Sequence, residues 1–396
     1  MRAAFSRIGS KISCDANTVT GALICAALIG RRVFMLAAAI VAAIAIVNRM
    51  RQRDPPEEEP ALDAPGVIRI APSRESLFHP PRGYAAIATA DVSALHDALR
   101  QAIVGQRDAI EALMLALVAD GHVLFEGAPG LAKTLACRTL AGSIAATFSR
   151  IQCTADLSPA DVVGCEIFDQ RDREFRTRLG PLFANVVLVD EINRASARTQ
   201  AALLEGLEEG RVTLGAHTYD LPVPFLVLGT MNEAEADGIY SLPAAQLDRF
   251  LLKVTLDFPT PREELEMLER FGGKFVPTVK PVVSLEMVCE WRNSACVIYC
   301  APALKEYIVA LVRATRNGPP EAELQHGAGP RAALALLRSA RAKALIAGRS
   351  YVLPADVRGI ACAALGHRVA FVNSFLLDRE ERERRLRTIV DRVRLP

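Results

Sequence analysis

The sequence predicts an α/β fold built on a parallel sheet, and three observations point to this class. Segments of helical and strand-like pattern alternate from Ala86 onward, the order that a parallel sheet requires. Four short apolar runs have the length and composition of buried strands: His122–Glu126, Arg150–Cys153, Val186–Val189 and Phe225–Leu228. A glycine-rich turn and a Lys-Thr pair follow the first run. Ligands of such sheets bind beyond the carboxyl ends of the strands, so we expect the chemistry there.

The overall composition excludes several classes of protein. At roughly 150 residues per domain, the 396 residues predict two or three domains. The chain is 51% hydrophobic and 23% charged, which are globular values and not those of a disordered or fibrous protein. The net charge of +2 implies no global attraction to nucleic acid or to an anionic membrane. None of the nine cysteines forms a CxxC pair, which excludes the usual zinc ribbons and fits a reducing compartment.

The N-terminal extension contains an unbroken apolar run, Val33–Val47, which contributes to the positive mean hydropathy of +0.20. At about 1.5 Å per residue the run covers roughly 22 Å, less than the roughly 30 Å of a bilayer core. Flanking arginines, such as Arg31 and Arg51, could make up the difference by snorkelling. Two interpretations stay open: a single membrane anchor, or an extension that precedes a translation start at Met50.

Residues 51–85 form an extended linker, because they contain seven prolines and the acidic run Glu57–Glu59. We therefore divide the chain into an extension with its linker (1–85), an α/β core (86–258) and a helical domain (259–396). In the helical domain, Leu304–Arg313 and Ala332–Leu345 show helical apolar spacing, and Asp378–Arg394 predicts an amphipathic helix docked on its own domain. Three cysteines of this part are expected to be buried free thiols: Cys289, Cys296 and Cys300.

The first strand is followed by a loop with the features of a phosphate-binding loop. Backbone N–H groups of the turn and of the helix start can cradle phosphates. Lys133 can reach the β- and γ-phosphate oxygens, and Thr134 can bind Mg²⁺. The residue before the lysine is Ala132, where the usual pattern has glycine. The cofactor-binding residues of the loop are predicted to be Gly127, Ala128, Pro129, Gly130, Leu131, Ala132, Lys133, Thr134 and Leu135.

The third strand ends in two carboxylates, Asp190 and Glu191. At this position Asp190 would hold the Mg²⁺ shell, and Glu191 would orient and deprotonate an attacking water. An acidic helix N-cap is the alternative for an aspartate here. The pair follows Lys133 by 57 residues with one strand between, and this spacing favours nucleotide hydrolysis.

Three further polar residues are candidates at weaker positions. Asn232 follows the fourth strand and could position water or a γ-phosphate, although a lone asparagine there is more often a turn residue. Arg249 precedes the strand-like stretch Leu251–Leu256 and is either a surface ion-pair partner or an arginine finger. Arg331 follows a proline at a helix start, which is a routine position.

Taken in order, these motifs resemble the AAA+ ATPases, and more closely their MoxR family. The resemblance covers about residues 90–372 and extends to the Ala132 version of the loop. It rests on Ile103–Gln106, Gly121–Gly127, Pro129–Thr134, Gly180–Asn185, Asp190–Ala195, Thr199–Glu205, Ala245–Phe250, Pro330–Ala332 and Gly348–Val352. Two departures lie beside Asn232: the family usually reads Thr-Gln-Asn-Pro, and this chain has Met231 before the asparagine and Glu233 after it.

The resemblance implies an αβα core with a parallel five-stranded sheet, a small all-helical lid, and a hexameric ring with ATP between subunits. It makes Lys133 and Thr134 Walker A residues, and Asp190 and Glu191 Walker B residues. Asn232 becomes sensor 1, Arg249 the arginine finger and Arg331 sensor 2; whether Arg331 acts on its own or a neighbour's nucleotide stays open. Gly105 and Gln106 would line the adenine pocket. ATP and Mg²⁺ are the implied cofactors.

Two segments of the core have the pattern of β-hairpins, Val163–Gly180 and Arg211–Leu221. The resemblance places them as insertions that face the central opening of the ring, where substrates are contacted. Solvated charged hairpins are the alternative. Neither has an aromatic–apolar–Gly loop of the kind that grips a threaded polypeptide, which favours remodelling of a folded partner over processive unfolding.

The resemblance therefore implies a cytoplasmic ATPase, with the inner membrane as its location if Val33–Val47 is an anchor. It would remodel a protein complex, activate it, or insert a cofactor into it. Its partner would often carry a von Willebrand A domain. A motor or loader acting on nucleic acid is the alternative, but the 163–180 hairpin mixes both charge signs. A nucleotide-regulated scaffold is disfavoured by the presence of Asp190, Glu191, Asn232 and Arg249.

Overall fold

The computed structural model describes residues 90–232, 240, 242–273, 279–317, 323–372 and 377–396. Val33–Val47, the proline-rich linker and Glu233 lie outside these residues. The first described element, α3 (Ala90–Ala102), begins four residues after the predicted start of the folded chain at Ala86. Among the described residues no helix is both long and apolar enough to cross a membrane.

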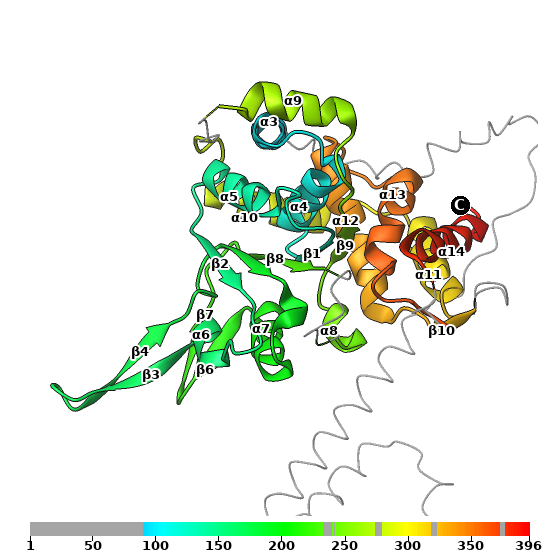
Figure 1. The fold of residues 1–396 in the computed structure, drawn as a ribbon. Helices are drawn as coiled ribbons and strands as arrows, with labels where there is room; N and C mark the ends of the chain where they lie inside the picture. The colour runs from blue at the N-terminus through cyan, green and yellow to red at the C-terminus, as the bar shows by residue number, and fades with distance from the viewer. Residues whose placement is uncertain (1–89, 233–239, 241, 274–278, 318–322, 373–376) are drawn as a thin grey trace, which may run out of the picture. The chain divides into compact units, whose positions relative to one another are not determined.

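The core of the fold is a five-stranded sheet, and every strand pairing in it is parallel. This confirms the predicted sheet (Figure 1). The strand order is β2 (Phe148–Gln152), β5 (Val186–Asp190), β8 (Leu226–Met231), β1 (Val123–Glu126) and β9 (Leu252–Thr255). The fourth predicted run is longer than expected and continues through Gly229 to Met231, because all six residues of β8 are buried and paired.

Alternate residues of the strands enter two separate hydrophobic clusters, one on each face of the sheet. Val123, Phe125 and Leu188 belong to one cluster, whereas Leu124 and Val187 belong to the other. Since successive side chains of a strand point to opposite faces, the sheet is covered on both sides. Helices α3, α4 (Arg107–Val118) and α5 (Lys133–Ser143) cover the first face; α6 (Pro159–Val163) and α7 (Ala197–Glu209) cover the second.

Both predicted hairpins are present. One pairs β3 (Gly164–Asp169) with β4 (Glu174–Leu179), and the other pairs β6 (Arg211–Leu214) with β7 (His217–Asp220). They differ in burial: Val212 of β6 is buried in the second cluster, whereas β4 is exposed over most of its length. The β3–β4 hairpin therefore extends away from the sheet (Figure 1).

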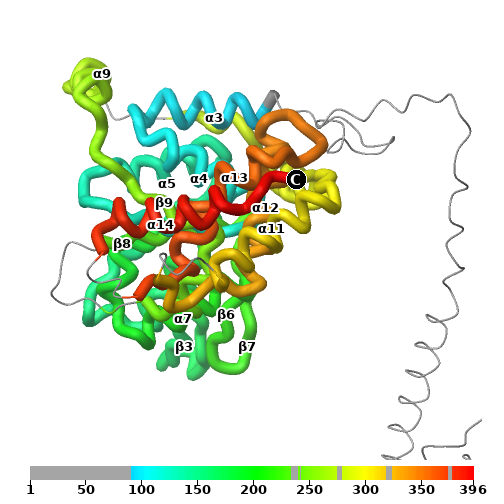
Figure 2. The backbone as a smooth tube through the Cα atoms, turned by 90° about the vertical axis from the view of Figure 1, so that its right-hand side faces the viewer, coloured from blue at the N-terminus to red at the C-terminus, as the bar shows by residue number. Residues whose placement is uncertain are grey.

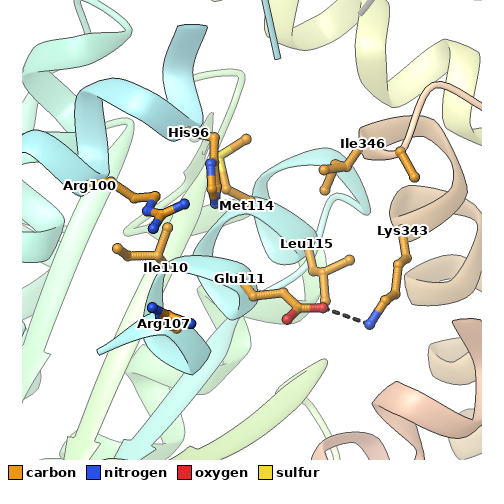
Figure 3. A pocket seen from close by; sticks show the side chains of 10 residues that line it. His96, Arg100, Arg107, Ile110, Glu111, Met114, Leu115, Lys343 and Ile346 are labelled. Carbon is orange, nitrogen blue, oxygen red and sulfur yellow. Dashed lines mark hydrogen bonds and ion pairs between the residues drawn. The ribbon is translucent and has the colours of Figure 1, made fainter. Parts of the chain in front are cut away.

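The C-terminal part is mainly helical, as predicted (Figure 2). Its helices are α9 (Pro261–Phe271), α10 (Leu285–Val297), α11 (Pro302–Ala314), α12 (Pro330–Ile346), α13 (Pro354–Leu365) and α14 (Arg379–Arg392). A short antiparallel pair, β10 (Leu324–His326) with β11 (Ala370–Phe371), was not expected. The predicted docking of the last helix is confirmed, because Leu386, Ile389 and Val390 of α14 are buried in the same cluster as α11 and α13.

The prediction for the three cysteines is only partly correct. All three are free, but only Cys300 is buried, whereas Cys289 is partly exposed and Cys296 is exposed. The reason is their position on α10, whose buried face consists of Val288, Trp291 and Ala295. Cys289 and Cys296 follow these residues by one position, which turns them about 100° away from that face. The domain boundaries at residues 85 and 258 stay predictions.

Candidate functional site

Three neighbouring strands bring predicted functional residues to one edge of the sheet. Strands β5, β8 and β1 are adjacent and run in the same direction. The Gly127–Leu135 loop follows β1, Asp190 and Glu191 stand at the end of β5, and Asn232 follows β8. Parallel pairing therefore places these segments side by side, although they are far apart in the sequence.

The loop after β1 has the backbone conformation of an anion cradle. Gly127 and Gly130 have φ angles of 154° and 86°, which side-chain-bearing residues rarely adopt. A Cβ on Gly127 would lie 2.8 Å from the carbonyl oxygen of Leu256, so only glycine fits there. Ala132, with φ of 57°, is the N-cap of α5 and also adopts the left-handed conformation. The unpaired N–H groups of the α5 start can therefore point at a bound anion.

Lys133 lies at the centre of the charged groups at this edge. Its Nζ donates a hydrogen bond to the carbonyl oxygen of Gly127 at 2.6 Å. Partial burial lowers the pKa of Lys133, while Asp190, Glu191 and Glu126 oppose this shift by Coulomb attraction. The loop lysine and the two carboxylates of β5 thus act on one another across the strand that separates β1 from β5.

Asp190 has partners for both of its oxygens. Thr230 Oγ1 donates to Asp190 Oδ1 at 2.8 Å, and the Arg150 guanidinium donates to Oδ2 at 2.7 and 3.1 Å. Thr230 Oγ1 also accepts a hydrogen bond from the backbone N–H of Glu191 at 2.8 Å. Strands β2 and β8 on either side of β5 therefore hold this carboxylate in place.

Glu191 is in a left-handed backbone conformation with φ of 55°, which is uncommon for a residue with a long side chain. Its Oε2 lies 3.3 Å from Arg194 Nη1 and accepts a hydrogen bond from Gln152 Nε2 at 3.2 Å. The conformation turns Glu191 out of the strand at the edge where a ligand would bind. Strain of this kind is typical of functional sites.

Asn232 and the predicted adenine-pocket residues lie along the same edge. The carbonyl oxygen of Asn232 accepts a hydrogen bond from Asn193 Nδ2 at 3.2 Å. Gln106 Nε2 donates to the carbonyl oxygen of Asp257, just past β9, at 2.8 Å. Gly105, with φ of 68°, lies close to the Glu263 carboxyl group at the start of α9. Gly105 and Gln106 thus stand near the end of β9, next to the strand that carries the loop.

Arg249 and Arg331 meet at one carboxylate in another place. Arg249 Nε lies 2.9 Å from Glu208 Oε2, and Arg331 pairs with Oε1 of the same glutamate near the end of α7. Arg331 Nη1 is also 4.0 Å from Asp248. In the described part of the chain, the ion pairs of these arginines involve neither the Gly127–Leu135 loop nor Asp190 and Glu191. The structure brings the two arginines together but not to the loop.

The residues of the sheet edge fit a nucleotide with Mg²⁺. The exposed glycine-rich turn and Lys133 offer N–H groups and positive charge to phosphates. Thr134 and Asp190 provide the oxygen ligands that Mg²⁺ prefers. No cluster of three or more metal-binding side chains occurs among the described residues, so most of the Mg²⁺ shell would be water and phosphate oxygens.

Sequence reasoning missed the partners of the two carboxylates. Arg150, Gln152 and Thr230 all lie in strands next to β5, and Gln152 is directly paired with Asp190. Only the strand order shows that these residues face one another. Alternation along the run Arg150–Cys153 could have indicated that Arg150 and Gln152 share a face.

Comparison with known proteins shows the family of the chain. Residues 122–252 match the family described as "ATPase family associated with various cellular activities (AAA)", and residues 320–389 match the AAA lid domain. The chain is 40% identical to Chaperone MoxR1 of Mycobacterium tuberculosis over 341 residues, covering 84% of this chain and 89% of that protein. It is 30% identical to Protein MoxR of Methylorubrum extorquens, covering 68% and 85% respectively.

A solved structure is similar over most of the described chain. A protein from Cytophaga hutchinsonii that is proposed to be an ATPase superposes with a TM-score of 0.71 at 38% identity. The match covers 77% of this chain and 95% of that one.

Proposed function

This chain belongs to the MoxR-type AAA+ ATPases, and from that premise we propose that it uses ATP hydrolysis to remodel a partner protein complex. The remodelling would activate the complex or insert a cofactor into it. The observation that carries the proposal is the sheet edge where the Gly127–Leu135 loop, Asp190 and Glu191 lie together. These groups supply what phosphoryl transfer needs, which is positioning and charge stabilisation.

In this proposal each residue of the edge has one role. The loop N–H groups and Lys133 bind the phosphates, and Gly105 and Gln106 lie against the adenine. Thr134 and Asp190 hold Mg²⁺, which when bound neutralises charge on the phosphate oxygens. Glu191 accepts a proton from the attacking water, and Asn232 orients that water.

We assign Arg249 and Arg331 to the nucleotide of a neighbouring subunit. The support is their shared carboxylate: both arginines pair with Glu208, and neither pairs with the loop of its own chain among the described residues. Glu208 holds the two guanidinium groups next to each other, so one phosphate group of a neighbouring copy could contact both. A head-to-tail ring, hexameric in this proposal, provides this arrangement at every interface.

A protein client is favoured over nucleic acid by charge. The net charge of the chain is +2, so binding to a phosphate backbone has no global electrostatic support. The relative from Mycobacterium tuberculosis is called a chaperone, and this name supports the choice of a protein client. The proposal of a partner with a von Willebrand A domain rests on the family resemblance alone.

Replacing Glu191 with glutamine tests this function. The variant should bind ATP like the wild type but hydrolyse it about a hundredfold more slowly, because the base that accepts the proton is removed. ATP binding and phosphate release are measured in parallel. The ATP-bound variant then serves as a trap for pulling down the client.

Glu205→Gln, on the exposed surface of α7, is the matched control and should keep wild-type turnover. Wild-type turnover by Glu191→Gln would contradict the proposed mechanism.

A further inference from the structure

The β3–β4 hairpin exposes four large apolar side chains. Ile167, Phe168, Phe175 and Leu179 are 45%, 49%, 70% and 48% exposed. Phe168 and Phe175 are direct partners in the strand register, so they lie on one face of the hairpin with ring centroids 5.2 Å apart. Neither ring belongs to the two hydrophobic clusters of the core.

The base of the hairpin is held in place, whereas the aromatic pair lies beyond that contact. Thr177 Oγ1 and the Tyr219 hydroxyl are 2.8 Å apart, which links β4 to the second hairpin. Glu166 lies against Gly215 in the turn of that hairpin. Phe168 and Phe175 are farther along β3 and β4 toward the tip, where the hairpin projects from the sheet (Figure 1).

A shallow hollow of about 370 Å³ adjoins the aromatic pair, and Phe168 is part of its lining. Ile167 and Arg176, which are direct partners in the register, contribute to its lining together with Arg178. This volume is within the range of clefts that accept small ligands or side chains. The aromatic pair and the hollow therefore share one residue, Phe168.

The charges around the tip decide between two kinds of partner. Exposed aromatic rings can stack on nucleic acid bases, but such sites also need surplus positive charge along the backbone path. Here the hairpin has four basic residues and four acidic ones, and Arg176 pairs with both Asp172 and Asp169. The eight charged residues are Glu166, Asp169, Arg171, Asp172, Arg173, Glu174, Arg176 and Arg178. The hairpin is thus electrically balanced, which favours a protein partner.

We propose that the aromatic pair Phe168–Phe175 is a docking surface for an exposed apolar segment of the client protein. The inference rests on the proposed function and adds to it the chemistry of the contact. Exposed aromatic side chains cost little conformational entropy on binding and bury a large area, so they commonly dominate protein interfaces. The pair gives each subunit a client contact that needs no aromatic–apolar–Gly loop.

Neither phenylalanine stood out in the sequence. They are seven residues apart in a strongly charged segment, and only the register of β3 and β4 places them opposite each other. A search for a contiguous gripping loop therefore misses them.

The test measures binding of the full-length chain to a fluorescent, permanently unfolded probe, reduced and carboxymethylated lactalbumin, in the Glu191→Gln background with ATP. Changing Phe168 and Phe175 together to threonine should raise the Kd of the probe by about tenfold or more. The double change to tyrosine keeps the aromatic area and should stay within about twofold of the parent. Asp169→Asn with Glu174→Gln alters the neighbouring charged pair and should also leave binding unchanged.

Other outcomes overturn the inference. An unchanged Kd for the threonine variant, or no binding of the probe by the parent chain, shows that the pair does not dock apolar segments. Pair-dependent binding of an oligo(dT) strand in place of the probe assigns the surface to nucleic acid. A changed oligomer size of the threonine variant in light scattering assigns it to contacts between copies of this chain.

ATP turnover of the same substitutions in the wild-type background separates this inference from the proposed function. The threonine variant should keep turnover within about twofold, because the hairpin lies outside the nucleotide site. If the wild-type chain itself fails to hydrolyse ATP, the proposed function is wrong whatever the probe shows. If turnover is intact and the Kd is unchanged, only the docking inference is wrong.

Discussion

Asp190 and Glu191 each have a basic side chain within reach, Arg150 for the first and Arg194 for the second. Both arginines are about half exposed, so these ion pairs contribute little to folding. They also lie where Mg²⁺ and phosphate oxygens would bring their own charges. We infer that nucleotide binding rearranges the two pairs, since Mg²⁺ would replace Arg150 as the cation on Asp190.

His122 links the first strand to the opposite face of the sheet, and its burial predicts a pH effect. Its Nδ1 accepts a hydrogen bond from the backbone N–H of Val227, and its Nε2 donates to the carbonyl oxygen of Leu207. Protonation would place a second donor against the Val227 N–H. Burial lowers the pKa of His122 to about 4, from 6.5 in its unperturbed state.

The sign of the effect follows from this shift. Between pH 6.5 and pH 4 the unfolded chain binds a proton at His122 and the folded chain does not, so stability falls as the pH falls. Between pH 7 and pH 5 this group should remove about 2 kcal/mol from the free energy of unfolding.

Urea denaturation at both pH values measures the loss. His122→Gln should show a loss of stability that is smaller by that amount. The control is His96→Gln: the His96 ring lies on α3 and is partly exposed, so this variant should behave like the wild type. An equal loss in His122→Gln and the wild type would show that His122 does not titrate in this way.

At the scale of elements, Arg368 joins the end of α13 to the segment that carries Arg249. Its side chain is 3% exposed and pairs with Asp248 at 2.6 Å. It also donates to the carbonyl oxygens of Asp248, Phe250 and Leu251. One buried guanidinium therefore fixes the turn between α8 (Ala244–Leu247) and β9.

Arg368→Met should lower the free energy of unfolding by about 3 kcal/mol, because it removes the close cation of the Asp248 carboxylate and the guanidinium hydrogen bonds to three carbonyl oxygens, of which that of Phe250 keeps a second partner, His367. Arg358→Met is the matched control. Arg358 also pairs with an aspartate, but both side chains of that pair are 47% exposed, so its loss should be below about 1 kcal/mol. Equal losses in the two variants, measured by urea denaturation, would mean that the junction is not held by Arg368.

The elements of the fold were largely predictable from local pattern. Five strands, two hairpins and the last helix follow from apolar runs, glycine turns and helical spacing, each of which is a short-range signal. The β10–β11 pair could not be predicted in this way, because His326 and Ala370 lie far apart in sequence and neither segment has a strand pattern. The exposure of Cys296 was missed since it depends on which face of α10 is buried.

Functional residues of the candidate site could be predicted where they lie at the end of a strand. Contacts between side chains of several elements could not. Asp190 ends one strand, Asn232 follows another, and Lys133 lies at the end of the loop after a third, so the parallel order alone brings them to one edge. The partners of Asp190, and the pairing of Arg249 with Arg331 through Glu208, depend on tertiary packing.

At the scale of the whole molecule, the proposed reaction is divided between two copies of the chain. The loop and the carboxylates stand at one edge of the sheet, and Arg249 and Arg331 pair with Glu208 elsewhere on the same chain. In the proposed ring each copy would carry both halves of a site, and a head-to-tail interface would complete it.

The most direct test of this division is ATP turnover in a mixture of two inactive variants. Lys133→Ala should lose ATP binding, and Arg249→Ala should bind ATP without hydrolysing it, so each alone should be inactive. Mixed in equal amounts, they should regain about a quarter of wild-type turnover, because random head-to-tail pairing joins an intact loop to an intact arginine at that frequency. No turnover in co-assembled mixtures would contradict the account and place Arg249 at the nucleotide of its own chain.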